Sequence, residues 1–248
     1  AHKEQFKKFR KGLDVLSMTA TPIPRTLYMA LAHIRDMSVI ETPPTNRKAI
    51  ETYVTEYNDD LIRDSINWEL SRGGQIFFVH NRIRDIEEWA YRIQELVPEA
   101  IVSIGHGKMD KKGLEKVMRN FIQGAIDVLL CTTIIESGLD IPNANTIIIN
   151  RPELMGLSQL YQLRGRVGRG ERKGFAYFLQ PSKRTLSEAA EKRLRAILSH
   201  QEVGSGFRIA MRDLEIRGTG NILGAQQSGH IHAVGFELYC QMLAEAVA

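Results

Sequence analysis

Short apolar segments alternate with amphipathic segments through the middle of the chain. Several of the apolar segments contain no polar residue at all, as at residues 128–131 and 147–149. Strands that are buried on both faces have this pattern, which is typical of a parallel sheet covered by helices. We therefore predict strands at residues 14–18, 75–80, 101–104, 127–132, 146–150 and 175–180.

The amphipathic segments between these strands have helical spacing. Within residues 83–96 the apolar residues form one stripe along a helix, made by Ile86, Trp89, Ala90, Ile93 and Leu96. Helices are predicted at residues 59–71, 83–96 and 111–123, and after the last strand at residues 187–200, 206–215 and 234–247. Strands that alternate with helices along the chain predict an α/β fold.

Two changes of composition divide the chain. The proline-containing stretch at residues 42–46 suits a linker, because proline blocks both helix and central strand. From about residue 182 onward strand patterns stop, and a segment with repeated glycines at residues 217–229 separates the later helical patterns.

Charge, cysteine content and the length of the apolar runs limit the partners and the cellular compartment that the protein can have. The 248 residues carry a formal net charge of +4, and this mildly basic balance fits a polyanionic partner. The two cysteines form no disulfide framework and no metal-ligand spacing, which favours a cytoplasmic protein without a bound metal. Apolar runs are far shorter than the roughly 20 residues of a membrane span, and no signal-peptide pattern follows Ala1. Since the chain also lacks an initiator methionine, we expect it to be part of a longer protein.

An arginine-rich segment carries the most specific candidate chemistry. Gln162, Arg166 and Arg169 are spaced so that a helix would place them on one face, and Gly165 and Gly168 between them would let a ligand approach the backbone. Two guanidinium groups on one stripe suit a polyanion. We hypothesise that the anion is the γ-phosphate of a nucleotide held by a partner lobe. The alternatives are a solvated turn and a contact to nucleic-acid phosphate.

Polar residues follow two of the predicted strands. In open α/β sheets ligands lie beyond the carboxyl ends of the strands. Thr132 and the backbone amides after it can bind a nucleic-acid phosphate, although Thr132 or Thr133 can equally cap a helix. Asp140 can accept from a ribose hydroxyl or hold an arginine. His106 lies between two glycines that would admit a phosphate, but a histidine there is more often a turn residue.

Two further observations concern hydrolysis. Thr19 and Thr21 follow a predicted strand, so their hydroxyl groups can contact a catalytic carboxylate or a phosphate, or belong to an ordinary turn before Pro22. No Gly-x4-Gly-Lys-Ser/Thr phosphate loop occurs in the chain, and no Asp-Glu motif stands where a magnesium site would be expected. We therefore predict that this chain alone does not hydrolyse ATP.

The order of these motifs resembles that of superfamily 2 DNA translocases from helicase motif III to motif VI. Residues 213–218 and 224–229 also resemble the TRG (translocation in RecG) motif, which is found in RecG and in the transcription-repair coupling factors. Residues 42–47, 76–82 and 229–239 are more similar to the coupling factors. The resemblance covers essentially the whole chain, with one departure at Ala225 and Gln226, where the family usually has acidic residues.

The resemblance implies a division into three regions. Residues 1–45 would be a remnant of a first RecA-like lobe that includes motif III, and residues 46–182 would be the second RecA-like lobe. Residues 183–248 would form the TRG helical hairpin, its loop and the start of a following helix. The implied fold is a RecA-like parallel sheet flanked by helices and followed by an α-helical hairpin.

The resemblance also assigns roles to individual residues. Arg166 and Arg169 would be catalytic arginine fingers. The implied nucleotide-binding residues are Gln162, Gly138 and Asp140. The implied DNA-binding residues are Thr132 and His106 with the loop around it. The residues that would couple hydrolysis to movement are Thr19, Thr21, Arg193, Arg217 and Gln227.

The function that the resemblance implies is ATP-dependent translocation on double-stranded DNA. Such a protein displaces stalled RNA polymerase and couples transcription to nucleotide excision repair. It uses ATP with Mg²⁺ in the intact protein, whereas this chain alone would bind neither tightly. RNA polymerase and an excision-repair protein would bind regions outside the chain, and no membrane partner is expected. Two alternatives stay open: a RecG-type fork-remodelling helicase and a non-enzymatic DNA-binding module.

Overall fold

The computed structural model describes most of the chain between residues 48 and 217. Described in full are residues 37–40, 48–135, 140–170, 172–181 and 186–216, with the backbone of Glu136, Ser137 and Arg217. The remaining described residues are Leu16, Met18, Thr19, Thr21 and Thr42. The helix predicted at residues 234–247 lies outside this part of the chain, and so does most of the strand predicted at residues 14–18.

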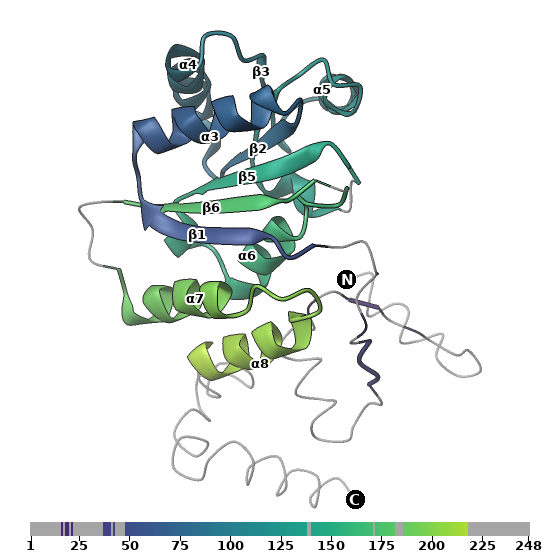
Figure 1. Cartoon of the computed structure of the whole chain (residues 1–248), viewed down its shortest axis with the longest axis vertical. Helices are drawn as coiled ribbons and strands as arrows, with labels where there is room; N and C mark the ends of the chain where they lie inside the picture. Colours follow the sequence, from purple (N-terminus) through teal and green to yellow (C-terminus); the bar gives the residue numbers. More distant parts are fainter. Residues whose placement is uncertain are drawn as a thin grey trace, which may run out of the picture.

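A single parallel sheet forms the centre of the described structure (Figure 1). Its 6 strands are arranged in the order β1-β6-β5-β2-β4-β3. Their bounds are β1 (Glu51–Glu56), β2 (Gln75–His80), β3 (Val102–Gly105), β4 (Val128–Cys131), β5 (Ala144–Asn150) and β6 (Phe175–Gln180). The predicted strands at residues 75–80 and 175–180 coincide with β2 and β6, and the other three central predictions differ by one or two residues at their ends. The prediction of a parallel α/β sheet is confirmed.

Strand β1 was not predicted from the sequence. It lies at one edge of the sheet and pairs in parallel with β6. Only Thr52 of its residues is fully buried, and both of its ends are glutamates, so it lacks the uninterrupted apolar run of the central strands. An edge strand has a neighbouring strand on one side only and is less buried than a central strand, which explains the weak apolar signal.

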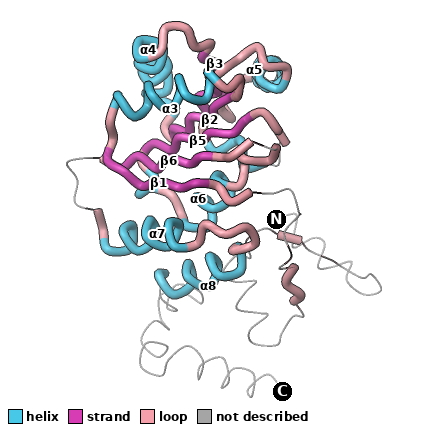
Figure 2. Tube along the Cα trace, in the orientation of Figure 1, coloured by secondary structure: helices cyan, strands magenta, loops and turns pink. Residues whose placement is uncertain are grey.

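Helices cover both faces of the sheet (Figure 2). The helices are α3 (Asp59–Ser71), α4 (Ile86–Leu96), α5 (Lys111–Ile122), α6 (Leu157–Arg164), α7 (Glu188–Ser199) and α8 (Gly206–Arg217). Alternate residues of β2 face the two layers: Phe78 belongs to the hydrophobic cluster that contains residues of α3 and α4, and Phe77 belongs to the cluster that contains residues of α5, α6, α7 and α8. None of the helices in the described residues is both long and apolar enough to cross a membrane.

Helix α6 ends earlier than the arginine stripe requires. It stops at Arg164, with Gly165 as its cap residue, so Arg166 and Arg169 lie beyond it and the prediction of one shared helical face is wrong. Gly168 has a φ of +64°, which a helix does not allow. The close approach at Gly168 comes from the chain itself, because a Cβ added to Gly174 would lie 2.8 Å from the Gly168 Cα.

Candidate nucleic-acid interface and nucleotide-facing segment

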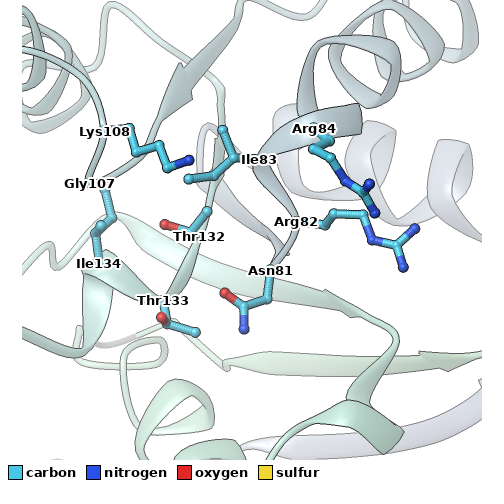
Figure 3. Close-up of a pocket in the computed structure, with 9 residues that line it drawn as sticks. All are labelled: Asn81, Arg82, Ile83, Arg84, Gly107, Lys108, Thr132, Thr133 and Ile134. Atoms are coloured by element: carbon cyan, nitrogen blue, oxygen red, sulfur yellow. The ribbon is translucent and has the colours of Figure 1, made fainter.

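A basic pocket lies at the carboxyl edge of the sheet (Figure 3). Strands β3, β4 and β2 are neighbours in the sheet, and the residues that follow each of them meet there. The pocket has a volume of about 530 Å³. It is lined by Asn81, Arg82, Ile83 and Arg84 after β2, by Gly107 and Lys108 after β3, and by Thr132, Thr133 and Ile134 after β4.

The chemistry of this pocket suits a phosphate backbone. Its charged lining residues, Arg82, Arg84 and Lys108, are all cations, and the hydroxyl groups of Thr132 and Thr133 add neutral donors. Lys108 extends inward from one rim, whereas the guanidinium groups of Arg82 and Arg84 extend from the opposite rim, away from Thr132 (Figure 3). Cations and hydroxyl donors of this kind contact phosphate oxygens without reading base sequence.

Of the two residues that were predicted to contact DNA, Thr132 and His106, only Thr132 lines the pocket. Thr132 lines the pocket and is 8% exposed. His106 is half-buried and does not line it, whereas the next two residues, Gly107 and Lys108, do. Within the described residues the Nδ1 atom of His106 is buried and has no hydrogen-bond partner. The loop around His106 therefore reaches the pocket, but the histidine side chain itself does not.

Sequence reasoning did not select most of the pocket's donors. Asn81, Arg82, Arg84 and Lys108 were not identified as site residues. Asn81 and the two arginines follow a fully buried strand directly, which is the signal that selected Thr132. The same rule, that ligands bind beyond the carboxyl ends of strands, would have found them.

Arg169, in the arginine-rich segment, forms an ion pair with Asp140. The Nη1 atom of Arg169 lies 3.0 Å from Oδ1 of Asp140, and its Nε donates to the carbonyl of Gly165. The Asp140 side chain is 67% exposed and that of Arg169 is 25% exposed, so the ion pair is open to solvent. Of the two roles considered for Asp140, the structure shows contact with an arginine. Arg166 is half-buried after the end of α6.

Gln162 joins the arginine-rich segment to the beginning of the chain. Its Nε2 atom donates to the hydroxyl of Thr21 at 2.8 Å. Thr21 is 1% exposed, and its carbonyl accepts from the hydroxyl of exposed Thr19 at 2.7 Å. The structure thus brings a predicted nucleotide-binding residue into contact with Thr21, which in turn is hydrogen-bonded to Thr19, the other threonine that was predicted to act in coupling.

Arg164 is a buried cation that sequence reasoning did not select. It is the last residue of α6 and is 3% exposed. Its guanidinium donates to the carbonyls of Ile197 at 2.9 Å and His200 at 2.6 Å, at the end of α7. Burial lowers the pKa of Arg164 to about 10, so the guanidinium stays charged at neutral pH. Arg164 therefore fixes α6 to α7 just before the segment that carries Arg166 and Arg169.

The other predicted coupling residues lie in or beyond the two carboxyl-terminal helices. Arg193 in α7 donates from Nη2 to the carbonyl of Glu153 at 3.0 Å, within the 3-10 helix η3 (Pro152–Leu154). Arg217 is the last residue of α8, and its side chain is outside the described part of the chain. Gly138 and Gln227 also lie outside the described residues.

Comparison with known proteins shows which class of protein has this fold and sequence. Residues 57–171 match the family described as "Helicase conserved C-terminal domain". A solved structure of RecG bound to a three-way DNA junction is 32% identical, with a TM-score of 0.70 over 94% of this chain and 31% of that one. A structure of Dbp5 from S. cerevisiae bound to Gle1 and IP6 is 19% identical, with a TM-score of 0.52 over 79% of this chain and 50% of that one, and shows the fold alone. The chain contains a RecA-like helicase C-terminal domain.

Two relatives that match nearly the whole chain identify a narrower group of proteins. Over 246 residues, 99% of the chain, it is 58% identical to the transcription-repair-coupling factor of Bacillus subtilis (strain 168). It is 54% identical over the same extent to the factor of Staphylococcus aureus (strain NCTC 8325 / PS 47). The chain is homologous to the transcription-repair-coupling factors and spans about a fifth of the length of these curated relatives.

Proposed function

We propose that the chain is the second lobe and adjoining hairpin of an ATP-dependent translocase on double-stranded DNA. The protein would displace stalled RNA polymerase in the cytoplasm and couple transcription to nucleotide excision repair. The observation that carries this proposal is 58% identity to a transcription-repair-coupling factor over 99% of the chain. RNA polymerase and the repair protein would bind regions outside these 248 residues.

The basic pocket is the proposed contact to DNA. Its donors come from three neighbouring strands, and its charged residues are all cations. Phosphate contacts release counterions from DNA, so affinity falls steeply with salt and depends little on base sequence. The pocket would hold the backbone of one strand while leaving the bases unread.

Replacing Lys108 or Arg84 with alanine is expected to lower the affinity for duplex DNA and to make that affinity less dependent on salt concentration. Each removes one phosphate contact, so the slope of log affinity against log salt concentration should fall by about one. The measurement is a fluorescence-anisotropy titration of a labelled duplex with the 248-residue chain at several salt concentrations.

Arg119→Ala is the matched control for these two variants. Arg119 is an exposed cation in the last turn of α5, whereas Lys108 lies just before the start of that helix. The control removes the same charge at the opposite end of α5 from the pocket. Equal slopes for Lys108→Ala, Arg84→Ala and the unmodified chain would show that DNA does not bind in the pocket.

The nucleotide would be bound by the arginine-rich segment together with a phosphate-binding lobe outside this chain. Guanidinium and amide donors on Arg169, Arg166 and Gln162 fit the oxygens of a triphosphate. Asp140 and Gly138 would lie on the same side of the nucleotide. ATP with Mg²⁺, when bound in the intact protein, would supply the phosphoryl group that is transferred to water. The described residues contain no cluster of three or more His, Cys, Asp or Glu suited to a metal ion.

The chain by itself is expected to show no appreciable ATP hydrolysis, with or without duplex DNA. Catalysis of phosphoryl transfer needs a cradle for the β- and γ-phosphates, and the sequence has no phosphate-loop motif. A coupled ATPase assay measures this directly. Turnover that rises on addition of duplex would contradict the prediction.

A RecG-type helicase is the second candidate, because a RecG structure matches 94% of the chain with a TM-score of 0.70. Competition between a three-way junction and a linear duplex of equal length separates the two readings, since a fork-remodelling protein prefers the junction. Duplex binding by a full-length protein that lacks ATPase activity would instead support a non-enzymatic DNA-binding module.

A further inference from the structure

One wall of the basic pocket is closed by a hydrogen bond between the residues on either side of it. The wall consists of Asn81, Arg82, Ile83 and Arg84. His80, the last residue of β2, precedes the wall, and Asp85, the last residue of the 3-10 helix η1 (Ile83–Asp85), follows it. The Nε2 atom of His80 lies 3.0 Å from Oδ1 of Asp85. Every residue enclosed by this bond therefore lines the pocket.

The sheet holds the other side of the same imidazole. Asn150, the last residue of β5, is paired with His80 in the β2–β5 register. Its Nδ2 atom lies 3.0 Å from Nδ1 of His80, and the two residues are 4% and 2% exposed. The ring of Trp89 in α4 packs against the imidazole, with 5.4 Å between the ring centroids. His80 is thus fixed by two strands and a helix before it contacts Asp85.

These contacts define the direction of each hydrogen bond. Because the Asn150 amide nitrogen donates to Nδ1, the proton of the neutral imidazole is on Nε2, which donates to Asp85. Burial opposes ionisation of Asp85, but the hydrogen bond from His80 and the charge of Arg82 outweigh it and keep the pKa of Asp85 below its usual value. The second oxygen of Asp85 lies 3.5 Å from Nη1 of Arg82.

We propose that Asn150, His80 and Asp85 form a clasp that fixes the pocket wall and thereby positions Arg82 and Arg84 for a phosphate backbone. His80 is a positioning residue in this proposal, since it does not line the pocket itself. The proposal rests on the proposed function of the pocket as a contact to DNA.

The wall needs such a clasp because its own structure is weak. Residues 81 and 82 have no regular secondary structure, and Arg82 provides no side-chain cap to the 3-10 helix that follows. A wall that samples several conformations must be ordered when DNA binds, and this ordering reduces affinity. Closing the wall with a bond anchored in the sheet removes most of that cost.

Two substitutions of His80 separate the two sides of the clasp. His80→Asn keeps an amide near the position of Nδ1, facing Asn150, but is too short to reach Asp85. His80→Gln extends an amide nitrogen to the position of Nε2 and restores the donor to Asp85. We expect His80→Asn to lower duplex affinity by about tenfold and the salt slope by about one to two, and His80→Gln to stay within about threefold of the unmodified chain.

Asp85→Ala and Asp85→Asn give the same test from the other partner. Asp85 is partly exposed, so its replacement leaves the core intact, and Asp85→Asn keeps an oxygen that can accept from Nε2. Asp85→Ala should behave like His80→Asn, and Asp85→Asn should be intermediate. Urea unfolding of each variant identifies the ones that remain folded at the temperature of the titration.

A measurement without DNA keeps the clasp and the proposed function apart. In a ¹H–¹⁵N spectrum of the imidazole groups, the Nε2 proton of His80 should be protected from exchange, and Asp85→Ala should remove that protection. If Lys108→Ala and Arg84→Ala leave the salt slope unchanged while the Nε2 proton of His80 is still protected, the DNA site is rejected but the clasp is not. If Lys108→Ala and Arg84→Ala lower the salt slope as expected but His80→Asn and Asp85→Ala bind duplex like the unmodified chain, the positioning role is overturned. An unprotected Nε2 proton would overturn it as well.

Discussion

Replacing Arg169 with alanine in the full-length protein is expected to lower DNA-stimulated ATP turnover by about 10³-fold. A guanidinium supplied from across the nucleotide cleft stabilises the charge that spreads over the phosphoryl group during transfer. In the structure Arg169 contacts Asp140, whose side chain is 67% exposed. An ion pair this open contributes only about 0–1 kcal/mol, so a triphosphate can replace the carboxylate. Steady-state turnover at saturating duplex gives the result.

Arg172→Ala is the control for the loss of charge at Arg169. Arg172 is an exposed arginine in the same connection between α6 and β6, and its replacement should leave turnover near normal. Near-normal turnover of Arg169→Ala would contradict the finger role and leave a DNA contact or a structural role for this arginine. A similar loss in both variants would indicate a general effect of positive charge.

Replacing Arg164 with alanine should lower the free energy of unfolding by about 2–4 kcal/mol. The change leaves the carbonyls of Ile197 and His200 without their charged donor at the end of α7. It also removes the packing of the guanidinium on the ring of Tyr161, 5.0 Å from its centroid. Relief of the cost of burying the charge, which lowers the pKa of Arg164 to about 10, offsets part of this loss. Urea unfolding of the 248-residue chain measures the difference.

Arg164→Met and Arg195→Ala separate the contributions to this loss. Methionine fills much of the same space without donors, so Arg164→Met should recover the packing but not the hydrogen bonds. Arg195 lies in α7 with a side chain that is 77% exposed, and its replacement should change stability by less than about 0.5 kcal/mol. If Arg164→Met is as stable as the unmodified chain, the contacts to α7 contribute nothing measurable.

The elements of the sheet were predictable where burial is complete. β2 is buried along its whole length, and its apolar run predicted its bounds correctly. β1 was missed because this edge strand begins with Glu51 and ends with Glu56, and only one of its residues is fully buried. The end of α6 was missed for a different reason: Gly165 was taken as an opening for a ligand, whereas it caps the helix at Arg164.

The candidate site was predictable only in part. Thr132 could be selected because it follows a buried strand, and the structure places it in the pocket. Lys108 belongs to the loop around His106 that was predicted to contact DNA, but the sequence pointed to the histidine of that loop rather than to the lysine that lines the pocket. It joins the site because β3, β4 and β2 are neighbours in the sheet, which brings together loops from separate parts of the chain.

The sequence by itself determined the α/β class, the central strands and the order of the motifs, because these depend on local patterns of apolar and polar residues. The tertiary structure alone decided which residues meet. Gln162 reaches Thr21, Arg164 reaches the end of α7, and His80 lies between Asn150 and Asp85. These contacts depend on strand order and on where each helix stops, and both are set by packing between segments that are distant in the sequence. The arginines that first suggested a stripe on one helix therefore lie in the irregular segment after α6, which ends at Arg164.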